Sequence, residues 1–499
     1  MKKLLYVLSL MIIASMILTA CGSATPTAAP VVATEAPATA PAATEVPATA
    51  AAATEAPAAA PAELEGTLNV WSFTAELRTM AIAFQGKHPK VKVNYTLIPM
   101  TNGEYQTKVK AAAGTADSPD VVALEAAFVK EWVEADLLAD QNDLLPLTKD
   151  LKTYPAVVQV GTDKGVAKAF SYQATPGAFF YRRSIAKECL GTDDPAKVQE
   201  MVADMTKFVE TAAKIKDCGT KDYYTVGTGG ELFLPFLSNR AQPWIVDGKM
   251  VIDPKIEEYI KFAKLMRDNG YESGATQWSE GWFAGMNDTL KDAKGTPKKV
   301  FSYFLPTWGL PYVLSPNAKS KDGASDTSGD WAMINGPMSY QWGGTWVGAL
   351  QGSPNSALAK EFIKFVALDE ENLTNWATGV YTNEYLKAID PTTPDDQKQA
   401  AGDFVSSQLV VEKITASFDK STLADFLGGE NSYGAFAAAA PSVNGALLTG
   451  SDDAIQRALN DPRDAYLSGK ITEAEMYAQW LDAVRNEFPD LIIPEPPVK

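Results

Sequence analysis

Histidine and cysteine are almost absent from this chain of 499 residues. It has one histidine, His88, and three cysteines, Cys21, Cys189 and Cys218. A zinc site built from thiolates and imidazoles needs several such ligands, and a Ser-His-Asp or Cys-His mechanism would have to use His88 alone. His88 precedes a proline, where we expect a solvated helix cap. We therefore expect no metal site, no cofactor and no catalytic residue.

Positive charge is also scarce. The chain has 44 Lys and Arg against 61 Asp and Glu, a net charge of -17. Such an acidic protein repels nucleic acid, which we exclude as a partner. Three of the acids, Asp322, Asp326 and Asp330, share one polar loop. Their spacing does not fit a calcium loop, so we expect a solvated loop there.

Only one long apolar run occurs, between Leu4 and Leu18, behind a basic start. It is shorter than the ~20 residues of a good membrane span and is typical of a secretory signal peptide, expected over residues 1–20. The run ends in Leu18-Thr19-Ala20-Cys21, which resembles the bacterial lipobox. We therefore expect lipidation of Cys21 and an extracytoplasmic protein anchored to a bacterial membrane, on the cell surface or the periplasmic side.

The next segment lacks the large apolar side chains that a core requires. Residues 23–62 are only Ala, Pro, Thr, Val, Glu and Ser, with a near-repeat every ten residues at 33–37, 43–47 and 53–57. Frequent proline opposes helix, and nothing is available to bury. We expect a disordered Ala/Pro/Thr-rich tether over 21–63.

Strand and helix patterns alternate from Leu64 onward. Period-two and apolar patterns predict strands at 68–71, 91–97 and 120–124. Helical spacing predicts helices from the Thr74 cap to His88, at 104–113 and at 126–135. This alternation predicts an α/β sheet with helices on its faces. Ligands of such sheets lie beyond the carboxyl ends of strands, here Ser72-Phe73 and Glu125-Ala126.

The end of the chain carries a clear helix signal. Thr472 and Glu475 have the spacing of a capping box at the start of a helix expected from Ile471 to Phe488.

A series of short motifs resembles the extracellular solute-binding proteins (family 1) of ABC sugar importers, from Leu64 to about Lys387. The family's usual Thr-Trp-Asp-Glu is missing, and Val198–Val209 stands in its place. The motifs are Asn69-Val70-Trp71, Phe84 to Pro89, Ser118 to Val122, Ser171-Tyr172 with Ala178 to Arg183, Gly343 to Trp346, and Ser356 to Phe365.

The resemblance implies two α/β lobes of the periplasmic-binding-protein (venus-flytrap) type, joined by a hinge and closing on a solute. The expected lobes are 64–173 plus 327–372, and 174–326 plus 373–499. It also implies a monomeric receptor that binds a sugar and docks on ABC permease subunits, and that is not an enzyme.

Tryptophan supplies the candidate ligand contacts. Seven of eleven tryptophans lie between Trp244 and Trp346, and a flat indole suits the C–H face of a sugar ring. The preferred residues lie at turns or strand ends: Trp308, Trp342 and Trp346 first, then Trp71 and Trp282. Core packing is the alternative for each, and it is the expectation for Trp132, Trp376 and Trp480 on helices.

The candidate polar contacts are Glu125, Tyr172 and Gln173. Glu125 follows an apolar strand, where a helix N-terminal acid is the alternative. Tyr172 and Gln173 lie where the first crossing between lobes is expected, and Tyr172 could instead face the core. Cys189 and Cys218 could form a disulfide in an oxidising compartment.

Two other functions stay open at this point. A surface glycosidase or lyase acting on polysaccharide needs only two carboxylates, and the chain has 61 acids. The same receptor fold could also bind a polyamine or a peptide, because aromatic boxes with carboxylates hold cations as well.

Overall fold

The computed structural model describes residues 63–218, 222–397, 403–417 and 423–497. The expected signal peptide, Cys21 and almost all of the expected tether lie outside these residues. All of the described residues belong to one compact unit, 62–499. Among the described residues, no helix combines the length and the apolar character needed to span a bilayer.

The first lobe is built on a five-stranded sheet in the order β2-β1-β3-β14-β6. The three strands β1, β2 and β3 are parallel, and β14 runs antiparallel to both β3 and β6. The mixed α/β class expected from the sequence is confirmed. The strands are β1 (Gly66–Ser72), β2 (Val91–Leu97), β3 (Val121–Glu125), β6 (Ala169–Ser171) and β14 (Thr345–Ala349).

Strand pairing brings four chain segments together at the end of the sheet where the parallel strands have their carboxyl ends. Parallel β1 and β3 both end there, at Ser72 and Glu125. Antiparallel β14 begins there, because Thr345 pairs with Glu125, and Ser171 at the end of β6 pairs with Trp346. The expectation that Ser72-Phe73 and Glu125-Ala126 share an edge is confirmed.

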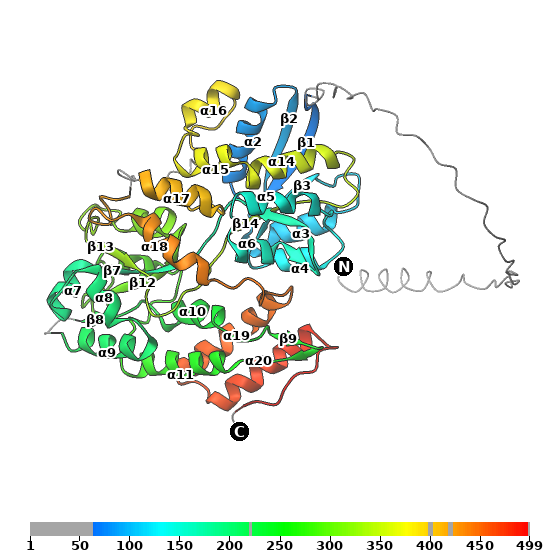
Figure 1. Ribbon diagram of the computed structural model, residues 1–499. Helices are drawn as coiled ribbons and strands as arrows, with labels where there is room; N and C mark the ends of the chain where they lie inside the picture. Colours follow the sequence, from blue (N-terminus) through cyan, green and yellow to red (C-terminus); the bar gives the residue numbers. More distant parts are fainter. Residues whose placement is uncertain (1–62, 219–221, 398–402, 418–422, 498–499) are drawn as a thin grey trace, which may run out of the picture. The chain divides into compact units, whose positions relative to one another are not determined.

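Helices cover both faces of the first sheet, and α2, α14 and α16 pack together on one side (Figure 1). The first helix begins at Glu76, two residues after the expected Thr74 cap, and the helix expected at 126–135 covers only 129–134. The helices of this lobe are α2 (Glu76–Lys87), α3 (Glu104–Ala112), α4 (Val129–Glu134), α5 (Leu145–Asp150), α6 (Pro155–Val160), α14 (Ser356–Leu368), α15 (Glu370–Ala377) and α16 (Asn383–Ile389).

The second lobe is built on a three-stranded antiparallel sheet in the order β12-β7-β13. Its strands are β7 (Gly177–Arg182), β12 (Ser302–Pro306) and β13 (Trp331–Ile334). All six residues of β7 are buried, since alternate side chains enter two different hydrophobic clusters. Phe180 joins the cluster that continues into the first lobe, whereas Phe179 and Tyr181 join the cluster of the second lobe.

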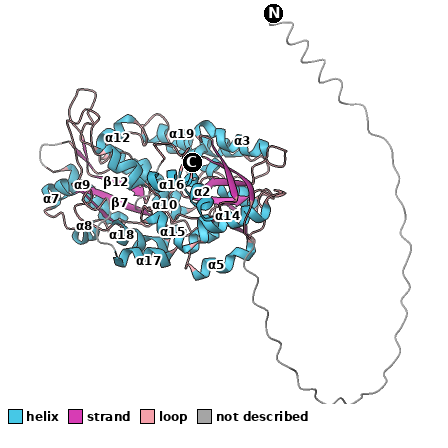
Figure 2. Cartoon of the chain, turned by 90° about the horizontal axis from the view of Figure 1, so that it is seen from above, coloured by secondary structure: helices cyan, strands magenta, loops and turns pink. Residues whose placement is uncertain are grey.

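The remaining elements belong mostly to the second lobe and the linking segments (Figure 2). The helices are α7 (Arg183–Leu190), α8 (Pro195–Met201), α9 (Met205–Lys216), α10 (Phe233–Ser238), α11 (Pro254–Asp268), α12 (Glu280–Met286), α13 (Ser315–Asn317), α17 (Gln408–Ser417), α18 (Ser432–Ala439), α19 (Asp452–Leu467) and α20 (Glu473–Glu487). Two-residue strands form the pairs β4 (Thr162–Asp163) with β5 (Val166–Ala167), β8 (Tyr223–Tyr224) with β11 (Lys299–Val300), and β9 (Ile245–Val246) with β10 (Lys249–Met250). Short helical turns are η1 (Thr101–Gly103), η2 (Asn142–Leu144), η3 (Gly229–Leu232), η4 (Leu310–Leu314) and η5 (Ala440–Ser442).

Two segments lie in a different lobe from the one expected. The strand β13 falls in 327–372, which was assigned to the first lobe, yet it pairs with β7 in the second sheet. The helix α16 and most of α15 fall in 373–499, assigned to the second lobe. Yet α16 packs on α2 and α15 packs on α14, both in the first lobe. The lobes defined by strand pairing and packing therefore differ from the residue ranges that were expected from the sequence.

Three neighbouring extended segments connect the two lobes. The first is 172–177, the second is 340–345 and the third is 403–406. The backbone of Trp342 donates to the carbonyl of Thr175 at 3.1 Å, and that of Ala174 donates to Phe404 at 3.1 Å. More than one crossing between the lobes, which the resemblance implied, is therefore present.

Several smaller expectations have outcomes in the structure. Thr472 and Glu475 form the expected capping box at the start of α20. Cys189 and Cys218 are joined in a disulfide with a Cα–Cα distance of 5.3 Å. Half-buried His88 caps α2, and its ring centroid lies 4.6 Å from that of Phe84.

The expectation of a purely solvated acidic loop is wrong for Asp330. Its carboxylate accepts hydrogen bonds from Arg182 Nε at 2.7 Å and Ser184 N at 2.7 Å, because the loop folds back on the start of α7. Within the described segments, no group of three or more His, Cys, Asp or Glu could hold a metal ion.

Candidate ligand-binding site

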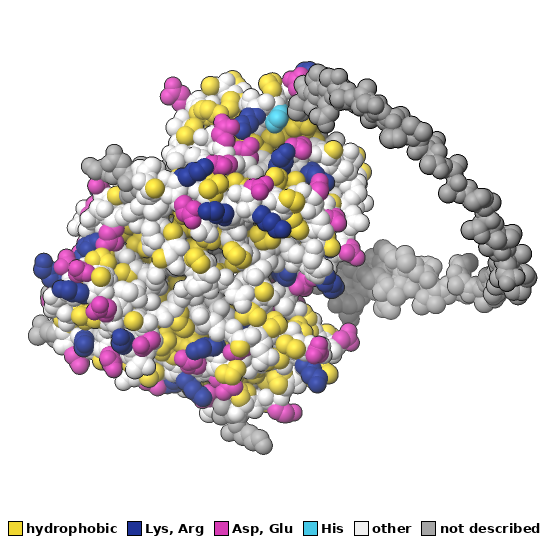
Figure 3. All heavy atoms as spheres, viewed as in Figure 1, with side chains coloured by type: hydrophobic (Ala, Val, Ile, Leu, Met, Phe, Trp, Pro, Cys, Tyr) yellow, Lys and Arg dark blue, Asp and Glu magenta, His cyan; other side chains and the backbone are white. Residues whose placement is uncertain are grey.

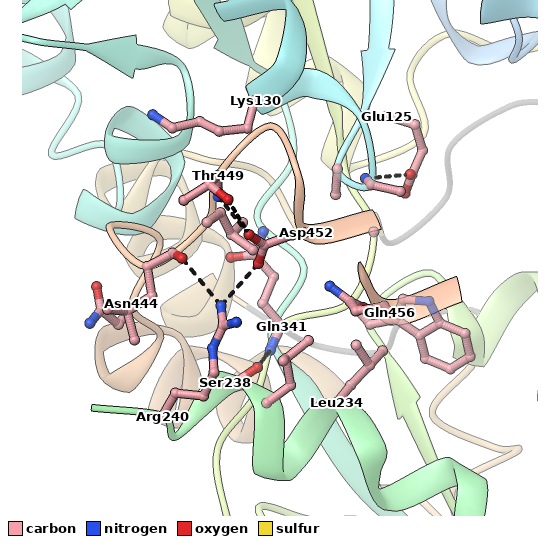
Figure 4. Close-up of a pocket in the computed structure, with 17 residues that line it drawn as sticks. Glu125, Lys130, Leu234, Ser238, Arg240, Gln341, Asn444, Thr449, Asp452 and Gln456 are labelled. Atoms are coloured by element: carbon pink, nitrogen blue, oxygen red, sulfur yellow. Dashed lines mark hydrogen bonds and ion pairs between the residues drawn. The ribbon is translucent and has the colours of Figure 1, made fainter. Parts of the chain in front are cut away.

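Glu125 stands at the sheet edge where β3 ends. Its Oε2 accepts a hydrogen bond from Ala127 N at 2.7 Å, drawn as a dashed line in Figure 4. Burial raises the pKa of Glu125 to about 7, although the backbone N–H groups of Ala127 and Ala126 act in the opposite direction. Near neutral pH this carboxyl group can therefore accept or donate a hydrogen bond.

The pair Gly343-Gly344 brings the second crossing segment close to two aromatic rings. Both residues have positive φ, 77° and 110°, which favours glycine. A Cβ on Gly343 would lie 2.7 Å from Trp308 Nε1 and 3.5 Å from Glu125 Oε1. Backbone, indole and carboxyl group therefore meet at this point, and no side chain larger than hydrogen fits there.

Four tryptophans form one group, here named the aromatic cluster: Trp278, Trp282, Trp308 and Trp342. The ring centroid of Trp278 lies 5.3 Å from Trp282, 6.2 Å from Trp308 and 5.6 Å from Trp342, and Trp308 lies 5.2 Å from Trp342. The rings of Trp278 and Trp308 are nearly parallel, at 10°. Trp308 Nε1 donates to the carbonyl oxygen of Trp342 at 2.9 Å.

Trp278 is the exposed member of the aromatic cluster, at 48% of its surface. Its φ is +69°, a left-handed conformation that is uncommon for a bulky residue. Such backbone conformations persist only where the surroundings enforce them, and they concentrate at binding sites. A half-exposed indole held in place by two other indoles offers a rigid apolar face to a solute.

A cavity of about 190 Å³ lies beside the aromatic cluster, between the lobes (Figure 4). The first lobe contributes Glu125 and Lys130, and the second crossing segment contributes Gln341 and Trp342. The second lobe contributes α10, through Leu234 and Leu237 among others, and the segment 443–451, here named the strap, with residues of α19.

A second cavity, of about 740 Å³, lies on the second lobe and is bordered by Trp278. Polar side chains are common around it, including Thr228, Gln277, Arg267 and Asn460. Leu234 borders both cavities, and Trp278 touches Trp342 of the first. The exposed indole of Trp278 thus borders the larger cavity and contacts a ring that borders the smaller one.

A buried polar network holds the hinge beside this region. Tyr172 Oη donates to Glu76 Oε2 at 2.7 Å. Gln173 Nε2 donates to Asp403 Oδ2 at 2.8 Å and contacts Glu76 Oε2 at 3.3 Å, and Trp376 Nε1 donates to Asp403 at 2.9 Å. Burial raises the pKa of Asp403. The network joins α2 to the first and third crossing segments.

The eight residues expected to contact a ligand fall into three groups. The first comprises Glu125, Trp308 and Trp342, which lie together at the small cavity or beside it. Tyr172 and Gln173 form the second group and take part in the hinge network. The third group, Trp71, Trp282 and Trp346, packs against other protein groups.

Each residue of the third group has an identifiable neighbour. Trp346 is 1% exposed, and its Nε1 donates to Val157 O of α6 at 3.0 Å. Trp282 is fully buried and donates to Glu231 Oε1 at 2.9 Å. Trp71 is half-buried against the core of the first lobe. The rings of Trp346 and Trp282 therefore have no open face. Helix α6 packs on Trp346, and Trp282 of α12 packs against Trp278, Phe283 and Tyr303.

Sequence reasoning missed three residues of this region: Trp278, Glu76 and Asp403. The tryptophan-rich stretch was a signal for Trp278, and a carboxylate after the first strand was a signal for Glu76. Asp403 had no such signal, because its partners lie 230 and 27 positions away.

Three other tryptophans, Trp132, Trp376 and Trp480, were expected to pack in the core. Each of them is at most 1% exposed.

Comparison with known proteins gives one family and one fold. A family model described as bacterial extracellular solute-binding protein matches residues 79–404. A solved extracellular solute-binding protein of family 1 is similar at a TM-score of 0.65 and 15% identity, covering 85% of this chain and 99% of that one. No curated protein matches the sequence.

Two similar structures are described with their ligands. One is an ABC transporter associated binding protein from B. animalis subsp. lactis in complex with beta-1,6-galactobiose, with a TM-score of 0.58, 21% identity, and coverage of 87% and 100%. The other is the galacto-N-biose/lacto-N-biose I-binding protein of the ABC transporter from Bifidobacterium longum in complex with lacto-N-biose, with a TM-score of 0.61, 13% identity, and coverage of 86% and 99%. At these identities the likeness shows the two-lobed fold.

Proposed function

The chain belongs to the bacterial extracellular solute-binding proteins, and from that premise we propose that it is the receptor of an ABC importer and binds a carbohydrate between its lobes. Membership of this family places the protein outside the cytoplasm. The carbohydrate, the permease subunits as partners, the monomeric state and a lipid anchor at Cys21 are parts of the proposal.

One observation carries the proposal: the exposed ring of Trp278, held by Trp308 and Trp342, borders the larger cavity, while Trp342 and Glu125 border the smaller one. A sugar ring has an apolar C–H face and a rim of hydroxyl groups, so an indole and nearby hydrogen-bonding groups suit it. The larger cavity has a volume within the ~300–1,000 Å³ of ordinary ligand pockets. Similar folds are described in complex with disaccharides.

The small cavity offers a poor arrangement for hydrolysis of a glycoside. That chemistry uses a pair of carboxyl groups, one on each side of the scissile bond. Among the described residues that line the small cavity, the carboxyl groups are Glu125 and Asp452. Both oxygens of Asp452 accept hydrogen bonds from Thr449 or Arg240. Among its described lining residues, the small cavity therefore has no free pair of carboxyl groups, which supports binding without turnover at that cavity.

Isothermal titration calorimetry of the purified protein with mono-, di- and oligosaccharides tests the proposal. A micromolar or tighter Kd for at least one sugar, with the sugar recovered unchanged, is the expected result. Release of shortened products would identify an enzyme. Binding of a polyamine or peptide but of no sugar would support the receptor function and contradict the proposal that the ligand is a carbohydrate.

A further inference from the structure

The small cavity has an apolar wall that hydroxyl groups do not suit. Leu234 and Leu237 of α10 face it from one side of the site, and Leu447 and Leu448 belong to the strap. A hydroxyl group placed against such a wall loses its hydrogen bonds to water and gains none in return, which is unfavourable. The cavity therefore selects a group that has an apolar part.

Most polar groups around the cavity already bind one another. Asp452 accepts from Arg240 Nη2 at 2.9 Å and from Thr449 at 2.9 and 2.6 Å, as the dashed lines of Figure 4 show. Lys130 Nζ donates to the carbonyl of Thr162 at 2.6 Å. Ser238 Oγ accepts from the backbone of Gln341 at 3.4 Å. These bonds stabilise the walls, whereas Nε and Nη1 of buried Arg240 have no hydrogen-bond partner among the described residues.

Two primary amides at the cavity are also without hydrogen-bond partners in the described part of the chain. Among the residues that the structure describes, the side chains of Gln341 and Gln456 have no hydrogen-bond partner, and both residues are half-buried. Figure 4 shows them in the labelled set around the cavity. Each amide has a carbonyl acceptor and an NH₂ donor. Glu125 Oε1 adds a third group that can accept or, when protonated, donate.

The size of the cavity excludes a whole disaccharide. Its volume of about 190 Å³ lies below the ~300–1,000 Å³ of pockets that enclose an entire ligand. A cavity of this size has room for one substituent of a sugar, and the larger cavity bordered by Trp278 has room for the rings.

We propose that this substituent is an acetamido group, so that the solute is an oligosaccharide containing an N-acetylated hexosamine. This inference rests on the proposed function and names its substrate class. The methyl group of an acetamido substituent suits the four leucines, and its N–H and C=O suit the open amides of Gln341 and Gln456. A hexose without the substituent offers only a hydroxyl group at the same position.

Matched disaccharide pairs test the proposal by calorimetry: N,N′-diacetylchitobiose against cellobiose, and the Galβ1-3GlcNAc disaccharide against Galβ1-3Glc. The expected result is that, in at least one pair, the acetamido sugar binds at least 10-fold more tightly than its hydroxyl counterpart. Equal affinities within every pair that binds would overturn the acetamido proposal and leave carbohydrate binding intact. Absence of binding by any sugar, including the panel above, would overturn the proposed function itself.

Two variants locate the effect. Gln456→Ala and Leu448→Asn should reduce the ratio of affinities within the preferred pair by at least threefold, because each removes one part of the match. Gln351→Ala, at an exposed turn away from both cavities, should leave the ratio unchanged. Thermal melts that match the parent protein show that each variant is folded. An unchanged ratio in folded Gln456→Ala and Leu448→Asn would overturn the assignment to this cavity.

Discussion

The indole N–H of Trp308 donates a hydrogen bond of 2.9 Å to the backbone carbonyl of Trp342. Trp308 follows strand β12 of the second lobe, whereas Trp342 belongs to a segment that crosses between the lobes. The bond thus holds an aromatic side chain of the second lobe against the crossing segment 340–345. An indole placed in this way keeps its position relative to the hinge.

Trp278→Ala should weaken sugar binding by roughly 2 kcal/mol, about 30-fold in Kd, which is typical of an aromatic residue at the centre of an interface. The reason is loss of the exposed ring that rests on Trp308 and Trp342. Calorimetry measures the change. Tyr385→Ala removes another exposed aromatic ring, 41% exposed on α16, and should have no effect. Equal losses in the two variants would contradict a specific role for Trp278.

Glu231 should make folding stability depend on pH. It is 4% exposed, and burial raises its pKa to about 8. In the unfolded chain it loses its proton near pH 4.3. Between these values the folded state binds more protons, so the free energy of unfolding decreases as pH rises, by at most about 1.4 kcal/mol per pH unit from this group. The stabilisation from protonated Glu231 is complete below the pKa of this group in the unfolded chain, and it is lost as the pH rises to about 8.

Urea unfolding at pH 5, 6.5 and 8.5 measures this slope. Glu231→Gln resembles the protonated acid and should flatten the curve, so that the variant gains stability relative to the parent as pH rises. Glu104→Gln, on the surface of α3, should leave the slope as in the parent. Parallel curves for the parent and Glu231→Gln would show that the carboxyl group is charged in the folded state.

Asp452→Ala should destabilise the protein by about 3–5 kcal/mol, because it leaves the guanidinium of Arg240 buried without its carboxylate. The two side chains are only 1% and 5% exposed. The neighbouring Asp453→Ala removes an ion pair with Arg457 on the helix surface and should cost less than about 1 kcal/mol. Chemical denaturation of both variants gives the comparison. Similar costs would mean that water reaches Arg240.

Gly445→Ala tests the contact between the strap and the first lobe. A Cβ there would lie 2.4 Å from the carbonyl oxygen of Ala156 in α6, so backbone must move. We expect a loss of about 1–3 kcal/mol in stability and weaker solute binding, because the strap carries Leu447 and Leu448. Gly434→Ala, in α18 with open space around it, should instead gain about 0.5–1 kcal/mol. A silent Gly445→Ala would show that the strap is not packed on α6.

Several elements could be predicted from the sequence because their signals are local. The alternation in 91–97 gives β2, and the pair Thr472 and Glu475 gives the start of α20. Boundaries that depend on distant pairing could not be predicted. The strand β13 is a short apolar segment, and only its partner β7, about 150 residues earlier, decides its lobe.

The site shows the same division. Trp308 and Trp342 lie at turns rich in glycine and proline, which is a local signal for exposure at a cleft. The open face of Trp278 depends on a left-handed backbone conformation and on rings from three other segments. Trp346 has a glycine-rich turn before it as well, yet its side chain falls on the face of the sheet that α6 covers. Strand register, which a turn does not reveal, decided that outcome.

All eleven tryptophans lie in described segments, and Trp278 alone among them is exposed. Its fluorescence emission is therefore the one most sensitive to the water at its ring, and its neighbours are close enough to pass excitation to it. A solute that covers this ring should shift the emission to shorter wavelength without any attached dye. The intrinsic tryptophan fluorescence of the protein should therefore report whether a solute is bound at Trp278.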